Sequence, residues 1–305
     1  MYKEFMSLAF FAFFFFILGY YVAYETPKPM AVYREKIEIL RERKRIDEYF
    51  RKFPIYYINL ERSKDRNENF IKEMKDYGMY NYQRINAVDG KEIKIHEHGE
   101  INGITYKANP NRTKIQLAVT LSHITAIIRG NEDGHENFMI MEDDAELTLV
   151  PYWKKSLNDI INEIPKDCDI LLLSNHRFMK EKRLELVKIK QSRDLNGVCY
   201  IVTKRGMLKI MNRIRPSPTK DPPTSEVTID LTPFPNNVFD GGFLSSFDVY
   251  TYNVTHFLLE NFKYNSTVSN TQEGNINDVQ KVSMQVLDNN SFIYDDIYNK
   301  GHNHQ

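Results

Sequence analysis

The sequence is poor in cysteine and has no excess of charge of either sign. Cys168 and Cys199 are the only cysteines among 305 residues, too few for a disulfide framework, and their spacing matches no C-x-x-C zinc pattern. They either form one disulfide in an oxidising compartment or are two buried free thiols. The 41 basic side chains balance the 41 acidic ones. A net charge of zero argues against a protein that binds nucleic acid by neutralising phosphates.

Two signatures of hydrolytic enzymes are also missing. The sequence has no Gly-x-Ser-x-Gly elbow, and Ser122 and His123 are adjacent in an expected helix, where neighbouring side chains point apart. These two residues therefore cannot form a nucleophile–base pair with each other. A two-metal phosphohydrolase is also disfavoured, because the dispersed Asp and His ligands that such a site needs are not apparent.

The N-terminal segment is a long apolar run. Residues 5–22 are almost wholly apolar, and a helix of about this length crosses the hydrocarbon core of a bilayer. A cleaved signal peptide is the alternative, but its apolar core is usually shorter and we find no A-x-A cleavage site. We expect residues 1–25 to be an uncleaved signal anchor and the polar remainder to be luminal, as in a type II membrane protein. Four N-x-S/T sequons are compatible with a luminal face: Asn111, Asn253, Asn265 and Asn289.

Composition divides the remainder of the chain into three parts. Residues 26–52 begin with a proline break and continue densely charged, which indicates a solvated helical stem. Residues 53–262 carry the strand and helix patterns of a folded domain. Residues 263–305 are rich in Asn and weakly patterned, so we expect a peripheral tail.

The folded part alternates strand and helix patterns. Short β-branched, aromatic and apolar runs predict buried strands, and apolar residues at helical spacing predict helices between them. The expected strands are residues 55–60, 82–88, 138–141, 168–174, 198–203 and 249–254. The expected helices cover about residues 63–77, 115–128, 153–164 and 207–214. The polar residues 91–112 predict a flexible, irregular insertion. Strand–helix–strand units of this kind are typical of an α/β nucleotide-binding fold.

Three consecutive carboxylates stand at the end of one expected strand. The apolar residues 138–141 are followed by Glu142, Asp143 and Asp144, at the edge where ligands bind in open α/β sheets. Burying these like charges unpaired would be costly. A Mn²⁺ or Mg²⁺ ion that bridges substrate phosphates would relieve their repulsion. A solvated acidic turn is the alternative, and the segment alone does not separate the two.

Basic side chains follow the first expected strand. Arg62 and Arg66 are placed to meet a phosphate or a uracil ring, a task that suits the planar guanidinium. A solvated basic turn would give the same sequence. His96 and His98, in the expected insertion, could ligate a metal or could simply be solvated.

Five short segments occur in a characteristic order. They are Tyr-Ile-Asn-Leu-Glu-Arg from Tyr57, Arg-Ile-Asn-Ala-Val-Asp-Gly from Arg84, Leu-Ser-His from Leu121, Ile-Met-Glu-Asp-Asp from Ile140 and Gly-Val-Cys-Tyr-Ile-Val from Gly197. In this order they resemble glycosyltransferase family 25, which includes lipopolysaccharide glycosyltransferases and procollagen galactosyltransferases. The resemblance covers about residues 55–261.

The resemblance implies an α/β domain with the GT-A, Rossmann-like fold that binds a nucleotide sugar, usually a UDP-sugar. It implies that Glu142 and Asp144 hold Mn²⁺ (or Mg²⁺) against the diphosphate of the donor. Asp143 is a catalytic candidate that would contact the donor sugar or a neighbouring basic side chain. Asn59, Arg62 and Arg66 would contact the nucleotide, and Asp89, Ser122 and His123 would shape the donor pocket.

The resemblance also implies inversion at the anomeric carbon, which needs a base that deprotonates the acceptor hydroxyl. Asp240, beside two glycines, is the candidate base; it could instead be a second metal contact or a helix cap. We expect an inverting transferase that moves galactose or glucose from a UDP-sugar to a hydroxyl of a glycan or glycoprotein acceptor. The alternative is a catalytically silent relative that binds glycans or serves as a scaffold. The intact acidic run favours the enzyme, because a silent relative has no need of it.

Overall fold

The computed structural model describes residues 48–93, 98–101, 104–108, 113–147, 150, 155–174, 185–190, 195–214, 228–232, 234, 239–252 and 259–260. The expected signal anchor, nearly all of the expected stem, the four sequons, His96 and the expected tail lie outside these residues. Within the described part of the chain, no helix combines the length and the apolarity needed to cross a membrane.

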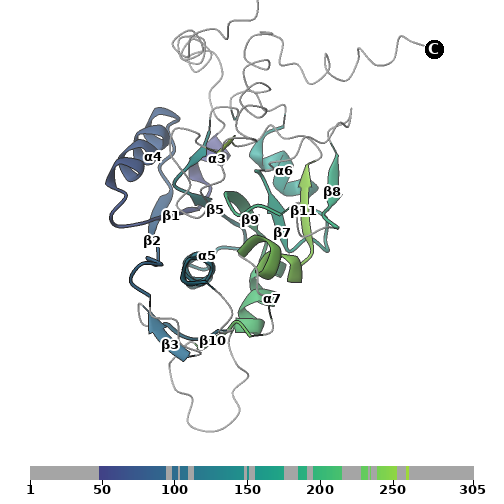
Figure 1. Cartoon of the computed structure of the whole chain (residues 1–305). Coiled ribbons are helices and arrows are strands. Elements are labelled where there is room, and N and C mark those ends of the chain that lie inside the picture. The colour runs from purple at the N-terminus through teal and green to yellow at the C-terminus, as the bar shows by residue number, and fades with distance from the viewer. Residues whose placement is uncertain are drawn as a thin grey trace, which may run out of the picture.

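A mixed seven-stranded sheet forms the centre of the domain (Figure 1). Its order across the sheet is β2 (Tyr82–Asn86), β1 (Ile55–Asn59), β5 (Phe138–Glu142), β9 (Cys199–Val202), β7 (Ile170–Leu172), β11 (Val249–Tyr252) and β8 (Leu186–Lys188). β1 is parallel to both β2 and β5, whereas β9 is antiparallel to its two neighbours, β5 and β7. The carboxyl ends of β1, β2 and β5 therefore meet at one edge.

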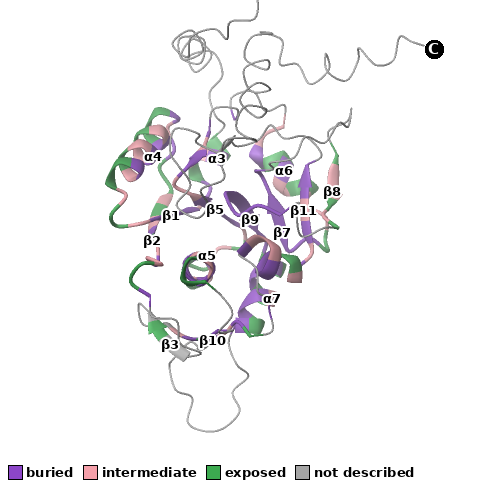
Figure 2. Cartoon of the chain, in the orientation of Figure 1, coloured by how far each residue is buried: buried purple, intermediate pink, exposed green. Residues whose placement is uncertain are grey.

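Alternate residues of the strands face two separate cores. Tyr56 and Ile58 of β1 belong to the core beneath α5 (Lys114–Glu132) and α7 (Lys204–Ile214), together with Tyr200 of β9. Ile55 and Tyr57 belong to the other core, which includes side chains of α3 (Glu48–Lys52), α4 (Lys64–Asp76) and α6 (Leu157–Glu163). Figure 2 shows the central strands buried between these layers. Strands buried on both faces explain why their sequences are continuously apolar rather than alternating.

Helix α5 is the central helix of its layer, and its sequence sets both of its ends. Thr113 and Gln116 form a capping box at the N-terminus, which satisfies two otherwise free backbone N–H groups. The helix continues to Glu132, beyond the expected end at about residue 128. Gly130 lies where a Cβ would come within 2.6 Å of the Phe138 ring, so it permits close packing, and Gly134, at φ +76°, follows the helix end.

The expected irregular insertion instead contains a β-hairpin. Strands β3 (His98–Ile101) and β4 (Ile104–Lys107) pair antiparallel, and β10 (Thr228–Asp230) adds to β4 as a third strand. A smaller pair joins β6 (Ala145–Glu146) to β12 (Leu259–Glu260). The hairpin was missed because its strands are short and polar, and its third strand comes from more than a hundred residues further along the chain. Ile229 of that strand is fully buried and anchors the small sheet.

The two cysteines do not pair. Both Cys168 and Cys199 are buried free thiols, the second of the two alternatives left open by the sequence. Burial raises the pKa of the Cys168 thiol to about 12 and raises that of Cys199 well above its ordinary value.

Candidate functional site

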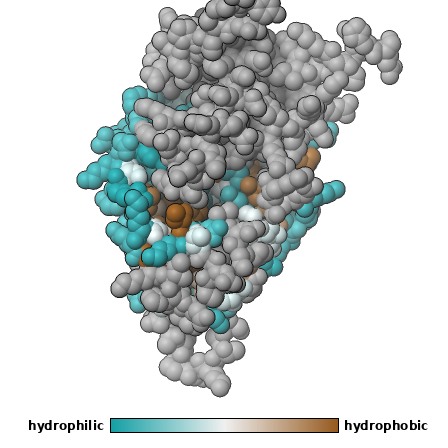
Figure 3. Space-filling model, in the orientation of Figure 1, coloured by the Kyte–Doolittle hydropathy of each residue, from teal (hydrophilic) through white to brown (hydrophobic). Residues whose placement is uncertain are grey.

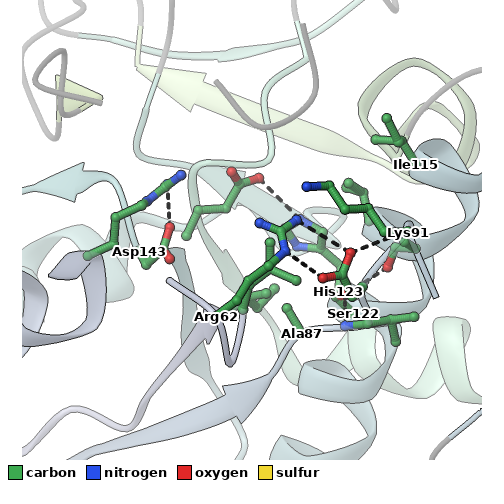
Figure 4. A pocket seen from close by; sticks show the side chains of 16 residues that line it. Arg62, Ala87, Lys91, Ile115, Ser122, His123 and Asp143 are labelled. Atoms are coloured by element: carbon green, nitrogen blue, oxygen red, sulfur yellow. Dashed lines mark hydrogen bonds and ion pairs between the residues drawn. The ribbon is translucent and has the colours of Figure 1, made fainter. Parts of the chain in front are cut away.

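A pocket opens beside the carboxyl ends of β1, β2 and β5. It measures about 720 Å³ with its open mouth, and it lies between these strand ends, the loop after β2 and the first half of α5. Its lining includes seven of the side chains expected from the sequence: Arg62, Arg66, Asp89, Ser122, His123, Glu142 and Asp143. Figure 4 shows five of the lining residues, Arg62, Lys91, Ser122, His123 and Asp143, around this space. Figure 3 shows apolar side chains bordered by hydrophilic ones on the face seen in Figure 1.

Arg66 holds two of the three consecutive carboxylates. This side chain, in the first turn of α4, is only 7% exposed. Its guanidinium forms an ion pair with Asp143 Oδ1 and another, at 2.6 Å, with Asp144 Oδ2. Asn59, the last residue of β1, donates from Nδ2 to Asp143 Oδ2 at 2.6 Å. The fold thus compensates the like charges of the acidic run with an internal cation and an amide.

Burial and charge compete at this cluster. Burial raises the pKa of the Asp143 carboxyl, and Arg66 and Asn59 offset only part of that rise. For Arg66, burial acts to lower the pKa, but the charges of Asp144, Asp143 and Glu142 outweigh it and raise the pKa above its usual value. The arginine therefore stays charged.

Glu142 contacts a histidine, whereas its two neighbours contact Arg66. Its Oε1 lies 3.3 Å from His123 Nε2, and its side chain is 32% exposed and lines the pocket. His123 is 1% exposed and stacks on Phe239 with ring centroids 4.0 Å apart. On its other side, His123 Nδ1 lies 3.0 Å from the hydroxyl of Tyr200. Glu142 is therefore the carboxylate of the acidic run that contacts His123 and lines the pocket.

Asp240 comes close to the same histidine from a distant part of the chain. It lies in a single π-helical turn, Phe239–Phe243, just before β11. A Cβ on Gly197 would lie 2.8 Å from Asp240 Oδ1 and 3.4 Å from His123 Cε1, so Gly197 lets these groups come together. The charges of Glu142 and Asp240 both act, after burial, to raise the pKa of Tyr200. Two carboxylates therefore flank the His123–Tyr200 pair, although Asp240 is not among the side chains that line the pocket.

Asp89 is held by the side chain of Arg62 and by the backbone of Lys91. Arg62 Nε donates to Asp89 Oδ2 at 2.6 Å, and the backbone N–H of Lys91 donates to Asp89 Oδ1 at 2.9 Å. The bond from Arg62 is the main cause that lowers the pKa of the Asp89 carboxyl. Ser122 lies behind this loop, where its hydroxyl accepts from the N–H of Val88 at 2.9 Å.

Lys91, Tyr200 and Arg84 were not predicted as site residues, although Tyr200 and Arg84 lie in two of the segments that resemble the family. Lys91 follows a polar turn that looks like any other, and Tyr200 lies in an apolar strand whose pattern says nothing about its hydroxyl. Arg84 is hidden in the same way in β2, where its Nε donates to Asn59 Oδ1 at 2.9 Å. These roles depend on which strands become neighbours.

A cation held by Glu142 and Asp144 does not fit this arrangement. Asp144 turns to Arg66 and is not among the pocket-lining residues, whereas Glu142 turns to His123. Among the described residues, no group of three or more His, Cys, Asp or Glu side chains is placed to hold a metal ion. The two predicted metal ligands therefore contact different partners, His123 for Glu142 and Arg66 for Asp144.

The architecture and the pocket together define a class of protein. A mixed α/β sheet with a charged pocket at the carboxyl ends of its parallel strands fits a Rossmann-like glycosyltransferase domain. Residues 52–221 match the family model of glycosyltransferase family 25 (LPS biosynthesis protein). The match covers more than half of the chain, so the chain belongs to glycosyltransferase family 25 and is a glycosyltransferase. A search among curated proteins finds no match.

Proposed function

We propose that the chain transfers a hexose, galactose or glucose, from a UDP-sugar to a hydroxyl of a glycan or protein acceptor, with inversion at the anomeric carbon. The observation that carries this proposal is the pocket itself. Glu142 and Asp143 of the acidic run expected at a donor site line its wall, and the cationic side chains of Arg62 and Lys91 line it as well. Cations on several sides of an enclosed space are suited to a diphosphate.

The donor would lie with its diphosphate near the mouth. Arg62 has a side chain that is 42% exposed and already oriented by Asp89, so its planar fork can bind a phosphate oxygen without being ordered first. Lys91, two residues after Asp89, lines the same pocket. Binding there would bring the anomeric carbon toward Glu142 and Asp143, deeper along the wall.

The reaction then needs a base and a departing diphosphate. A carboxylate removes the proton of the acceptor hydroxyl, the oxygen attacks the anomeric carbon from the face opposite the diphosphate, and the bond from that carbon to the phosphate oxygen breaks. Asp240 is our candidate for the base. It lies near His123, and it comes from the turn Phe239–Phe243 rather than from the strands that line the donor pocket. The chain offers Arg62 and Lys91, which line the pocket, to neutralise charge on the departing UDP.

The setting of the enzyme is proposed from the sequence. A signal anchor at residues 1–25 would hold the domain, residues 53–262, on the luminal side of a membrane, with residues 26–52 as a stem and residues 263–305 as a peripheral tail. The acceptor would then be a glycan or glycoprotein in that compartment, and nucleic acid is not expected as a partner because the net charge is zero.

A donor screen with the full chain tests the proposal. Release of UDP from UDP-galactose and UDP-glucose would be measured for the wild type, Glu142→Gln and Asp240→Asn. Glu136→Gln is the matched control, because Glu136 is exposed and lies just before the start of the strand that ends at Glu142. We expect losses of about 10²-fold or more for Glu142→Gln and Asp240→Asn, and little change for the control. Wild-type protein that turns over neither donor but still binds glycans would instead support the silent relative.

A further inference from the structure

Tyr200 is a fully buried side chain of β9 that belongs to the core beneath α5, and its hydroxyl contacts His123 of the site. Its ring is 0% exposed, and the hydroxyl lies 3.0 Å from His123 Nδ1. A buried tyrosine hydroxyl costs free energy unless it has a hydrogen-bond partner. His123 is that partner, and Figure 4 shows the histidine at the pocket wall.

For a neutral imidazole, the chemistry of its two neighbours sets the direction of both hydrogen bonds. The Glu142 carboxylate can only accept, so the His123 nitrogen that faces it, Nε2 at 3.3 Å, must carry a hydrogen. In a neutral imidazole Nδ1 then has none and accepts from the hydroxyl of Tyr200. Burial, and then the charges of Glu142 and Asp240, raise the pKa of Tyr200 well above its ordinary value, so the hydroxyl keeps the hydrogen that it donates.

The surrounding packing leaves the imidazole little freedom to turn. Phe239 lies parallel to it, with 7° between the two ring planes. Gly197 also lies against it, where a Cβ would approach His123 Cε1 to 3.4 Å. The ring can therefore transmit an orientation from one nitrogen to the other.

We propose that Tyr200 is a positioning residue of the donor pocket, which acts through His123 to fix the orientation of the Glu142 carboxylate. The chain of hydrogen bonds runs from Tyr200 to His123 Nδ1, and from His123 Nε2 to Glu142. The role of Glu142 in turnover rests on the proposed function, but the hydrogen-bonded chain does not.

The first test does not depend on activity. In the full chain labelled with ¹⁵N-histidine, long-range ¹H–¹⁵N NMR reports which imidazole nitrogen carries hydrogen, and His123→Gln identifies the signal. We expect Nε2 of His123 to be protonated and Nδ1 not. In Tyr200→Phe the Nδ1 signal should shift, while Tyr56→Phe should leave it unchanged. Tyr56 is the control, because its hydroxyl also makes a hydrogen bond, 2.7 Å to Asp133, away from the pocket. A protonated Nδ1 in the wild type, or no shift in Tyr200→Phe, would overturn the proposal.

The second test asks whether Tyr200 acts through Glu142. With a UDP-sugar that is turned over, Tyr200→Phe should lower kcat about tenfold with little change in KM, and should add almost nothing in a Glu142→Gln background. Equal losses in both backgrounds would mean that Tyr200 serves the fold alone, and would refute the positioning role. If the wild type turns over no donor, the proposed function fails while the NMR result still decides the hydrogen-bonded chain.

Discussion

Arg66 joins the acidic run to helix α4. The single guanidinium holds Asp143 and Asp144 in a setting where all three side chains are almost fully enclosed. Removal of one partner from a buried ionic group leaves uncompensated charge, which is far more costly than the pair itself is stabilising. The cluster is therefore more sensitive to substitution than an exposed ion pair.

Substitution of Arg66 should cost much of the stability of the domain. We expect Arg66→Met to lower the free energy of unfolding by about 3–5 kcal/mol, measured by urea denaturation. Lys204→Met is the control, since Lys204 pairs with Glu136 at an exposed site, and it should change the free energy by less than about 1 kcal/mol. Similar values for the two variants would show that Arg66 does not hold the buried carboxylates together.

Asp144 has two competing assignments: the sequence predicts a metal ligand, and the structure shows an ion pair with Arg66. If its main partner is Arg66, Mn²⁺ added to the nucleotide-free protein should not raise the unfolding temperature, and Asp144→Asn should lower that temperature with or without Mn²⁺. The measurement is thermal unfolding across a Mn²⁺ titration. Stabilisation of the wild type by Mn²⁺ that Asp144→Asn abolishes would support the metal assignment.

The cysteines provide a chemical test of burial. Because thiolates are the reactive form, and because burial raises the pKa of Cys168 to about 12, neither thiol should react with iodoacetamide at pH 8 in the folded protein. Mass spectrometry should show no modification of Cys168 or Cys199 in native buffer and modification of both in denaturant. A disulfide, seen as no modification in denaturant until a reductant is added, would contradict the structure.

At the scale of elements, a second charged cluster fastens α7 to the strands. Asp169, which is fully buried just before β7, accepts from Arg205 and Lys209, both at 2.6 Å, and from the backbone N–H of Asp248 at 2.8 Å. Asp248, just before β11, contacts both cations and also Lys188. One helix and three strands therefore share these charges.

This cluster should make stability depend on pH in the acid range. The bond from Lys188 is the largest cause that lowers the pKa of the Asp248 carboxyl in the folded protein, while burial opposes it and Lys209 and Arg205 add to it. A depressed pKa gives stabilisation that is complete above the ordinary value of 3.8 and is lost as the pH falls below it.

Asp248→Asn isolates that contribution. At pH 7 the substitution should reduce the free energy of unfolding by about 1 kcal/mol, a modest value because the pairs are partly exposed to solvent. The difference from the wild type should shrink as the pH falls from about 4 to 2, as measured by urea denaturation at each pH. A difference that grows toward low pH would contradict the assigned charge state.

Some strands could be predicted from their sequences and others could not. All six expected strands lie in the main sheet, because apolar runs such as residues 138–141 must be buried on both faces. Strands β3, β4, β6, β8, β10 and β12 were not predicted, since segments this short become strands only when a partner supplies the hydrogen bonds. The antiparallel direction of β9 also has no local signal, although it places Tyr200 against His123.

The candidate site was foreseen in its residue types more than in its geometry. The strand-end rule and the family motifs located Glu142, Asp143, Arg62 and His123, which line one pocket. The rule could not say that Asp144 turns to Arg66, because that contact depends on how α4 packs beside the strand. Asp240 was predicted from the family resemblance, as an acidic residue before the last expected strand, and only the fold brings it close to His123.

At the scale of the whole molecule, the described domain places its pocket at one edge of the sheet and the Asp169 cluster near the start of β7. The two sites share no side chain, so substitutions in the Asp169 cluster test stability without removing a pocket-lining group. The proposed membrane anchor would set the compartment in which donor and acceptor meet.

The anchor makes a prediction for the full chain. Expressed in a eukaryotic cell, the chain should stay with membranes after alkaline carbonate extraction, and an endoglycosidase should reduce its apparent mass through sugars at one or more of its four sequons. Deletion of residues 1–25 should abolish both properties. A full chain that is released by carbonate and lacks glycans would contradict the type II topology.

Binding of UDP to the pocket tests the central claim most directly. In calorimetric titrations of the full chain we expect UDP to bind the wild type and to bind Arg62→Met about tenfold more weakly, because the guanidinium held by Asp89 is lost from the mouth. Lys204→Met, which removes a cation outside the pocket, should bind UDP like the wild type. Equal affinity of Arg62→Met and the wild type, or no UDP binding at all, would contradict the claim that this pocket holds the nucleotide sugar.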